Sequence, residues 1–289
     1  MSHVNVLQIS DLHLTAPDKV LFGRDGDATL RAVLDDVERR GLVPDVVVAT
    51  GDLVHDGDRA SYERLGGVLG SLGAPVYCLA GNHDLAVPLE TSLPRVGVHV
   101  ERFARVANWA FFFVDSNRSG QVRNEHGALV DTDDRHHAAR TGAVDSAELD
   151  WLARAVRQTT AEHIFVWLHH PLVAHPRFQP AARSAYCESV LAQLAHDPRV
   201  KAVGAGHLHC GFESRLGALT MYGCPSSWLV MDFDNDTLAP PGYRWYSLHD
   251  DGHIDSVVCS VDDPRYAERA PLPRFVMELM TGEMGLGSH

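Results

Sequence analysis

Short apolar runs alternate with amphipathic segments through the first 85 residues. Three of the runs are almost continuous in Val, Ile, Leu and Ala, which favours buried strands, and they lie at 4–9, 45–50 and 75–80. Two intervening segments repeat apolar residues at helical spacing, at 28–40 and 59–72. This βαβαβ order, with strands that are apolar on both sides, predicts a parallel sheet covered on both faces.

The same alternation continues downstream. Further strands are expected at 98–103, 109–115, 163–168 and 200–205, and further helices at 146–158 and 181–196. The strands at 98–103 and 109–115 are predicted to form one hairpin, joined at 104–108. Residues 210–261 are predicted to be mostly β-structure, with Asp250-Asp251-Gly252 as a hairpin turn.

The pattern indicates a single domain over residues 1–261 with two irregular segments. Residues 116–142 are polar with little periodicity, so we expect a long insertion that acts as a lid or is disordered. Residues 262–289 are expected to form a C-terminal arm or a disordered tail. A chain of 289 residues with 45% hydrophobic residues is long enough to bury one large core.

Charge and cysteine usage narrow the choice of partner and compartment. The net charge of −13 argues against a nucleic-acid polymer as partner, because such binding needs a basic surface. Five scattered cysteines without a Cys-x-x-Cys pair argue against a disulfide framework and a thiolate zinc site. No signal sequence or membrane-length apolar run is found, so we expect a cytoplasmic protein that does not contact membranes. A homodimer through the C-terminal β-region or the arm is left open.

Side chains that commonly bind metals follow five of the expected strands. The segments are Asp11-x-His13, Gly51-Asp52, Gly81-Asn82-His83-Asp84, His169-His170-Pro171 and Gly206-His207-x-His209. The carboxyl ends of parallel strands meet at one edge of a sheet, where ligands bind, and glycine lets the backbones approach closely there. The sequence therefore predicts a two-metal site.

The donor types indicate the chemistry of such a site. Oxygen and imidazole ligands suit Mn, Fe, Zn or Co. A bridging carboxylate allows two ions about 3.5 to 4 Å apart, and a water bound to them has a pKa near 7, so that hydroxide is available without a separate general base. The amide of Asn82 carries no charge, so as a ligand it would leave the site more positive than Asp would, which favours a phosphate.

The ordered set resembles the signature of the calcineurin-like metallophosphoesterase superfamily, which reads D-x-H, G-D, G-N-H-[DE], H and G-H-x-H. The resemblance covers about residues 4–210. It implies an α/β fold of four layers, the α/β-β-α sandwich, in which helices flank two packed sheets.

The resemblance also implies a division of the ligands between two ions. One ion would be held by Asp11, His13, Asp52 and His209, and the second by Asp52, Asn82, His169 and His207, with Asp52 bridging. His169 rather than His170 is the implied ligand, because the family's histidine lies two residues before the proline, here Pro171. His170 is expected to pack or to support a ligand.

Two catalytic residues are implied next to Asn82. His83 matches the family's histidine that stabilises developing charge and protonates the leaving oxygen. Asp84 is expected to orient His83 through a hydrogen bond, as carboxylates do for imidazoles in metal sites. His55 and Asp56 are interpreted as loop residues, with a substrate contact as the alternative.

Within the superfamily, the chain is most similar to class III cyclic-nucleotide phosphodiesterases and glycerophosphodiesterases. The similar segments include LGAPVYCLAGNHD, FVDS at 113–116 and GAVDSAELDWL at 142–152. This implies hydrolysis of a small phosphodiester, with cyclic AMP as the best candidate, by attack of a metal-bridging hydroxide.

The leaving group is left open by two departures from this branch. Leu85 to Pro88 stand where an arginine is common, and Leu172 replaces a second proline. The alternatives are a phosphomonoesterase or nucleotidase, a glycerophosphodiesterase, and a non-catalytic scaffold with the same fold. The intact ligand set argues against the scaffold.

Overall fold

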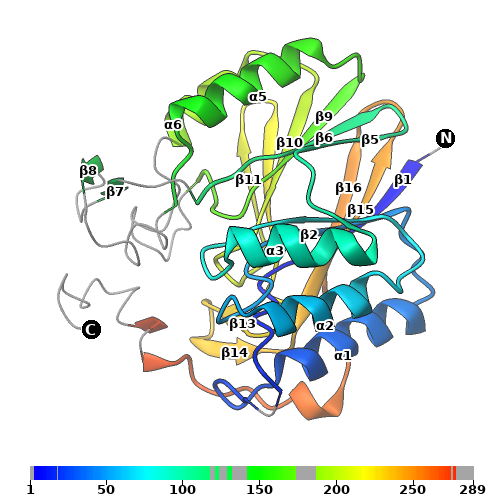
Figure 1. Ribbon diagram of the computed structural model, residues 1–289, viewed down its shortest axis with the longest axis vertical. Helices are drawn as coiled ribbons and strands as arrows, with labels where there is room; N and C mark the ends of the chain where they lie inside the picture. Colours follow the sequence, from blue (N-terminus) through cyan, green and yellow to red (C-terminus); the bar gives the residue numbers. More distant parts are fainter. Residues whose placement is uncertain are drawn as a thin grey trace.

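Two six-stranded sheets pack face to face at the centre of the molecule (Figure 1). The computed structural model describes residues 3–17, 19–117, 121–123, 129–131, 142–173, 187–274 and 276–277. The first sheet has the strand order β16 (Ile254–Ser260), β15 (Gly242–His249), β1 (His3–Ile9), β2 (Val46–Thr50), β3 (Val76–Leu79), β4 (Val98–His99). β1 to β4 run parallel, and β15 and β16 are antiparallel additions at one side.

The second sheet repeats this mixed arrangement. Its order is β11 (Phe212–Leu216), β12 (Leu219–Gly223), β10 (Val200–Ala205), β9 (His163–Trp167), β6 (Trp109–Phe113), β5 (Phe103–Val106). The four inner strands are parallel, and the two outer strands pair antiparallel with their neighbours. Two small hairpins complete the described strands, β7 (Gln121–Arg123) with β8 (Leu129–Asp131) and β13 (Val230–Asp232) with β14 (Thr237–Ala239).

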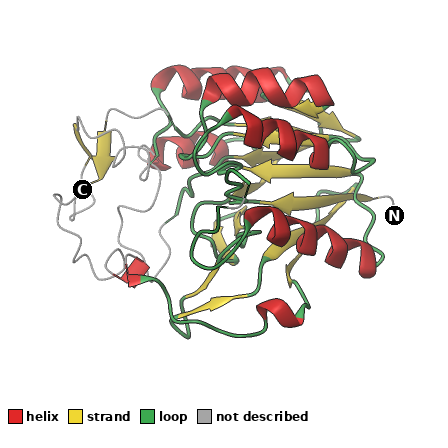
Figure 2. Cartoon of the chain, turned by 60° about the horizontal axis from the view of Figure 1, so that its bottom comes forward, coloured by secondary structure: helices red, strands yellow, loops and turns green. Residues whose placement is uncertain are grey.

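Helices cover the outer faces of both sheets (Figure 2). The helices that follow strands of the first sheet are α1 (Gly26–Arg39), α2 (Arg59–Leu69) and α3 (Ala86–Ser92), which runs into the short 3-10 helix η1 (Leu93–Val96). The second sheet carries α5 (Ser146–Gln158) and α6 (Cys187–Ala195). A last 3-10 helix, η3 (Pro264–Tyr266), lies in the C-terminal arm.

Three apolar clusters lie between these four layers. Alternate residues of β1 point to opposite sides, so that Leu7 and Ile9 pack with α1 and α2 while Val4 and Val6 pack between the sheets. The layer between the sheets also holds aromatic side chains of β6 and β9, among them Phe111 and Phe165. A separate cluster joins the second sheet to α5 and α6. The predicted four-layer sandwich is therefore confirmed.

One expected hairpin is wrong in its first strand. The segment 98–103 is not a single strand: Val98–His99 is β4 at the edge of the first sheet, and the chain then crosses to the second sheet as β5. The hairpin is β5 with β6, and it turns at Ala107, which has a left-handed φ of 52°. Hydrophobicity marked both strands but could not show which sheet each one joins.

Other element boundaries agree closely with the expectation. The helix at 146–158 and the strand at 200–205 are confirmed to the residue, and the hairpin of β15 and β16 turns at the expected site. α2 ends at Leu69, three residues before the expected end. Most of the insertion 116–142 lies outside the described residues, as do 181–186 at the expected start of α6.

Buried polar side chains link the two sheets. Gln8 of β1 donates to Thr50 Oγ1 at 2.9 Å and to the carbonyl of Ala205 in β10, and it accepts from Tyr246 Oη at 2.6 Å. Arg244 of β15 donates to carbonyl oxygens of the second sheet, at Gly223 and Phe212. Such groups cost free energy when buried unless they are hydrogen-bonded, so they favour one relative placement of the sheets.

The described part of the C-terminal arm packs on the domain. Leu272 and Val276 are buried in a cluster with Leu208, Cys210 and Trp228. The arm therefore lies against the segment that carries His207 and His209. Among the helices that the structure describes, none has the length and apolar character needed to cross a membrane.

Candidate metal centre

The seven predicted ligands come together where five parallel strands end. Each residue follows β1, β2, β3, β9 or β10, and all seven lie in the described part of the chain: Asp11, His13, Asp52, Asn82, His169, His207 and His209. The first sheet supplies the first four and the second sheet the last three. The centre therefore lies across the two sheets.

The loops after β1 and β2 remain paired beyond the strand ends. The backbone amide of Asp11 donates to the carbonyl of Gly51 at 3.0 Å. The backbone amide of His13 donates to the backbone carbonyl of Asp52 at 2.9 Å. One step further, Leu14 forms an isolated bridge with Val54, and the amide of His55 donates to Leu14 at 2.8 Å. This ladder holds the two loops in a fixed register, so their side chains are positioned almost as well as those of a strand.

Backbone strain is concentrated at the ligands. A positive φ is uncommon for residues other than glycine and costs about 1 kcal/mol or more. Five of the predicted ligands have φ between 46° and 69°, namely Asp11, His13, Asp52, His207 and His209. The left-handed conformation turns each side chain off the strand direction and into the centre. The surrounding ladder maintains this strain.

Glycines allow the loops to approach each other closely. A Cβ atom on Gly81 would lie 2.2 Å from both the backbone N and Oδ1 of Asp52. A Cβ on Gly206 would lie 2.0 Å from Ser10 Oγ and 2.8 Å from Asp11 Oδ2. Any other residue at these positions would displace a predicted ligand.

Asp52 occupies the middle of the cluster. Its Oδ2 atom is 3.5 Å from His13 Nε2 and 3.5 Å from His169 Nε2. On the same side, Asn82 Oδ1 is 3.1 Å from His169 Nε2. The other carboxylate oxygen, Oδ1, accepts the backbone amide of His83 at 2.8 Å. One carboxylate oxygen thus faces imidazoles from both sheets.

Asp11 connects the last two histidines to this group. The backbone amide of His207 donates to both Asp11 oxygens at 3.1 Å, and His209 Nε2 lies 3.4 Å from Asp11 Oδ1. His209 Nε2 is also 3.3 Å from His13 Nε2. Two imidazole nitrogens and two carboxylates therefore converge without side chains between them.

In three of the imidazoles, Nδ1 forms a hydrogen bond to a group outside the cluster, and Nε2 points into the centre. His169 Nδ1 donates to the carbonyl of Thr50 at 2.8 Å, and His209 Nδ1 donates to the carbonyl of Leu229 at 2.9 Å. His13 Nδ1 instead lies 3.1 Å from His55 Nδ1. An outward hydrogen bond of this kind fixes the tautomer of a metal-binding histidine. The arrangement therefore fits metal ions at the inward nitrogens.

Three groups of side chains have donor atoms close enough to hold an ion. Among the described residues these are Asp11, His13, Asp52 with His209; His169, His170 with His207; and His13, His55 with His83, with all donor atoms of a group within 4.8 Å. The first group is the predicted ligand set of one ion. The second contains two predicted ligands of the other ion.

Burial and neighbouring charges shift the pKa values of the ligands. Burial raises the pKa of Asp52, but the adjacent His169 and His13 outweigh it and hold the pKa well below its ordinary value. Burial lowers the pKa of His13 and of His207 well below the ordinary value. Burial also acts to lower the pKa of His169, but Asp52 and Asp11 raise it to about 9. Metal binding must displace the proton from His169.

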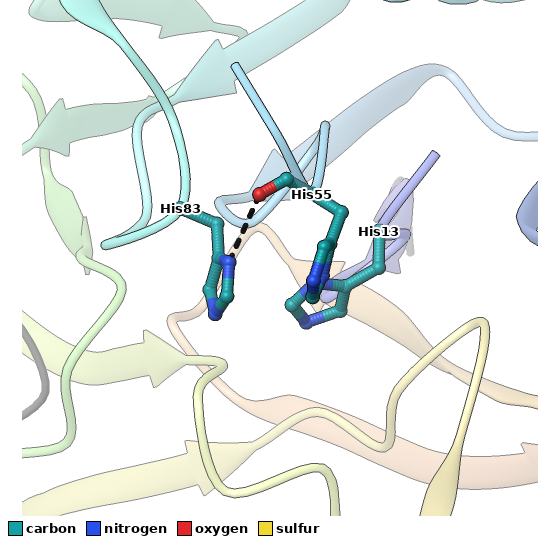
Figure 3. Close-up of side chains that lie close together, drawn as sticks. All are labelled: His13, His55 and His83. Carbon is teal, nitrogen blue, oxygen red and sulfur yellow. Dashed lines mark hydrogen bonds between the residues drawn. The ribbon is translucent and has the colours of Figure 1, made fainter. Parts of the chain in front are cut away.

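His83 is oriented by a backbone carbonyl and not by Asp84. Its Nδ1 donates to the carbonyl oxygen of His55 at 3.0 Å (Figure 3). The carboxylate of Asp84 accepts instead from the backbone amides of Leu53, Val54 and Gly81 and from Tyr62 Oη at 2.7 Å. The hydrogen bond expected between Asp84 and His83 is thus replaced by bonds that tie the loops after β2 and β3 together. Burial and the Asp52 charge raise the pKa of Asp84 to about 6.

His170 and His55 are also found next to the predicted ligands. His170 is fully buried, and its Nδ1 lies 2.9 Å from Ser116 Oγ, while its ring is 4.5 Å from that of His207. This agrees with a packing or supporting role. The contact of His55 with His13 was not expected, because a histidine five residues beyond the end of β2 has no periodic signal. Only the ladder of the two loops brings it there.

Comparison with known proteins identifies the family to which this site belongs. The family model described as calcineurin-like phosphoesterase matches residues 4–211. The chain belongs to the calcineurin-like phosphoesterase family. The matched range begins at β1 and ends just after His209, so it contains every predicted ligand of this phosphoesterase.

Relatives of this phosphoesterase are similar along nearly their whole length. The chain is 30% identical over 267 residues to a protein of Pseudomonas aeruginosa named 3′,5′-cyclic adenosine monophosphate phosphodiesterase CpdA, covering 90% of this chain and 91% of the relative. It is 29% identical to the protein of that name from Escherichia coli K12, covering 92% of each. The chain is therefore a metal-dependent phosphoester hydrolase of the phosphodiesterase type.

The fold of the phosphoesterase is shared with more distant proteins. A dimetal phosphatase from Danio rerio superposes with a TM-score of 0.59 at 16% identity, covering 90% of this chain and 99% of that one. A purple acid phosphatase from yellow lupin superposes with a TM-score of 0.61 at 11% identity, covering 94% of this chain and 54% of that one. The two packed sheets and their helices are thus a fold that this chain shares with these two proteins.

Proposed function

We propose that this phosphoesterase hydrolyses a 3′,5′-cyclic nucleotide, with cyclic AMP as the first candidate, at a centre of two metal ions. One ion would be held by Asp11, His13, Asp52 and His209. The other would be held by Asp52, Asn82, His169 and His207. The names of relatives that cover about nine-tenths of both chains support the choice of substrate.

The position of Asp52 carries the proposal of two ions. Its Oδ2 lies 3.5 Å from an imidazole nitrogen on either side, one from each proposed ligand set. A carboxylate in this place suits a bridge between two ions. The outward hydrogen bonds of His13, His169 and His209 support it, because they orient Nε2 toward the centre.

The donor set also suits a phosphodiester substrate. Two divalent ions would supply positive charge for the phosphate and a hydroxide nucleophile at neutral pH. The seven ligands contribute only two carboxylates, so the site keeps a net positive charge toward an anion. His83 stands beside this site with Nδ1 donating to the His55 carbonyl. Its Nε2 is then the atom available to hold or donate a proton to the leaving oxygen.

The test is to compare diester and monoester hydrolysis by the same metal-loaded protein. Cyclic AMP, bis-(p-nitrophenyl) phosphate and p-nitrophenyl phosphate would be assayed after stripping the protein and adding Mn²⁺. We expect cleavage of both diesters and much slower cleavage of the monoester. Asp52→Asn is expected to lose bound metal and activity together, and His99→Phe, which lies away from the centre, serves as the control.

Two results would contradict this function. Faster turnover of the monoester would make the protein a phosphomonoesterase with the same site. Failure to cleave any of the three compounds with any divalent ion, in protein that binds metal, would exclude the proposed diester substrate class.

A further inference from the structure

His55 is the residue next to the metal centre that neither the motif pattern nor the proposed ligand set includes. It is half-buried, and its Nδ1 lies 3.1 Å from His13 Nδ1. Figure 3 shows its ring close to those of His13 and His83, and it stacks on His83 with ring centroids 4.6 Å apart. Its contacts therefore reach one proposed ligand and one proposed catalytic residue.

The protonation of His13 determines the direction of the contact with His55. If His13 binds metal through Nε2, the neutral ring carries its proton on Nδ1. Nδ1 of His13 must then donate, and Nδ1 of His55 must accept with its lone pair. The other two outward bonds end on backbone carbonyls, at Thr50 and Leu229, so His13 alone depends on a side chain.

The same residue also holds His83, but through its backbone. The His55 carbonyl oxygen accepts from His83 Nδ1 at 3.0 Å. Because the amide of His55 is bonded to Leu14, the residue is held by the paired loops and not by its side chain. A substitution at this position therefore removes the contact with His13 and the ring stacking on His83, but it leaves the hydrogen bond from His83 to the backbone carbonyl in place.

We propose that His55 is a positioning residue for the metal centre: its Nδ1 accepts a hydrogen bond from Nδ1–H of His13 and thereby fixes the tautomer and ring orientation of that ligand. An acceptor at this point makes the ligand more basic. The ring of His13 also packs against Trp228 at 4.8 Å, which holds its faces but does not determine its tautomer. The inference depends on the proposed metal ligands and not on the proposed substrate.

The matched variants are His55→Asn and His55→Leu. Asn places an oxygen on the carbon that carries Nδ1 in histidine and has nearly the shape of Leu, but only Asn can accept the hydrogen bond. His99→Phe is the control, because the ring of His99 stacks on Tyr77 away from the centre. The readouts are Mn²⁺ affinity by chelator competition and the electron paramagnetic resonance signal of coupled Mn²⁺ ions.

We expect His55→Leu to weaken Mn²⁺ binding at one of the two sites by about 10- to 100-fold and to reduce the coupled signal. His55→Asn should stay within about three-fold of wild type. Thermal unfolding of the metal-free proteins checks that the variants fold. If the His55→Leu protein does not fold, His55→Ala is used in its place.

Three outcomes overturn the inference. Equal losses in the Asn and Leu variants would mean that the ring acts by packing, and normal binding in both would mean that the contact is unimportant. Three Mn²⁺ ions in wild type and two in His55→Leu would make His55 a ligand of its own. Wild-type protein that binds no Mn²⁺, Zn²⁺, Fe or Co would overturn the metal centre as well, whereas failure of cyclic AMP hydrolysis alone leaves this result standing.

Discussion

His83 forms hydrogen bonds in two directions. Its backbone bonds to a predicted metal ligand, and its ring bonds to the loop that contains His55. Its amide donates to Asp52 Oδ1, and its Nδ1 donates to the His55 carbonyl. The residue is therefore held from two sides while its Nε2 remains available. This geometry suits proton transfer without direct participation in metal binding.

His83→Ala is expected to keep both metal ions and to lower turnover by about 10²- to 10⁴-fold, the usual contribution of a positioned acid or base. Metal content by mass spectrometry and steady-state kinetics on the same preparation would measure the two effects. Loss of an ion in this variant would instead make His83 a metal ligand.

Glycine at position 81 is required by the space around Asp52. Gly81→Ala would place a Cβ 2.2 Å from the backbone N and Oδ1 of Asp52, so the carboxylate must move. A shift of about 1 Å in such a group can cost about 10²-fold in rate, and we expect at least this loss together with weaker metal binding. Metal titration and kinetics are the measurements.

Gly67→Ala is the matched control for this substitution. Gly67 lies on the exposed side of α2, and a Cβ there meets nothing within 4 Å. Alanine should stabilise the helix by about 0.4 to 1 kcal/mol, measured by denaturant unfolding, without changing activity. Normal activity of both variants would show that Asp52 tolerates displacement.

Among the elements, α1 is connected to the first sheet by hydrogen bonds to the buried carboxylate of Asp36. Asp36 accepts hydrogen bonds from Arg40, from Tyr243 Oη of β15 at 2.9 Å and from the backbone amide of Asp262 in the arm. Burial raises the pKa of Asp36, but these bonds outweigh it and hold the pKa below its ordinary value. The charged carboxylate thus joins a helix, a strand and the arm.

Asp36→Asn is expected to lower the free energy of unfolding by about 1 to 3 kcal/mol at pH 7, the range for hydrogen bonds to a charged group. Because the folded pKa is the lower one, this contribution is complete above the unfolded pKa of about 3.9 and is lost as the pH falls through the folded pKa. The difference between wild type and variant should therefore shrink below pH 4.

Urea unfolding at a series of pH values measures this dependence. Asp35→Asn, which removes the neighbouring exposed carboxylate, is the control and should change stability by less than about 0.5 kcal/mol. A difference between wild type and Asp36→Asn that does not depend on pH would mean that the shape of the side chain matters and its charge does not.

The elements show what a single sequence can and cannot predict. Apolar runs and turn residues predicted most strands and helices because burial and backbone preference are local properties, as for 146–158. The split at 98–103 escaped prediction because either sheet can bury the same residues. In the site, the ligand types followed from the strand ends, but the partners of Asp84 and His55 depend on contacts between loops distant in sequence.

For the whole molecule, the proposed metal ligands come from two sheets that otherwise meet through apolar packing and a few buried hydrogen bonds. Asp11 and Asp52 come from the first sheet, and His169, His207 and His209 come from the second. Ions held by both groups would bind the folded state alone, and ligands that bind only the folded state stabilise it.

Removal of metal with a chelator is therefore expected to lower the melting temperature by about 5 to 10 °C, on the basis of about 2.7 kcal/mol for one site at 100 times its dissociation constant. Calorimetry before and after chelation, and after Mn²⁺ is restored, would measure the shift. An unchanged melting temperature would show that the ions contribute little to holding the sheets together.

The position of β1 within the first sheet has a consequence for biosynthesis. β1 is near the beginning of the chain, and one of its two neighbours, β15, spans Gly242–His249. At about 5 to 20 residues per second, a ribosome needs roughly ten seconds or more between these strands. During that time an apolar strand edge lacks its partner and is open to aggregation. The nascent chain should therefore depend on ribosome-associated chaperones, and premature termination before β15 should yield insoluble fragments.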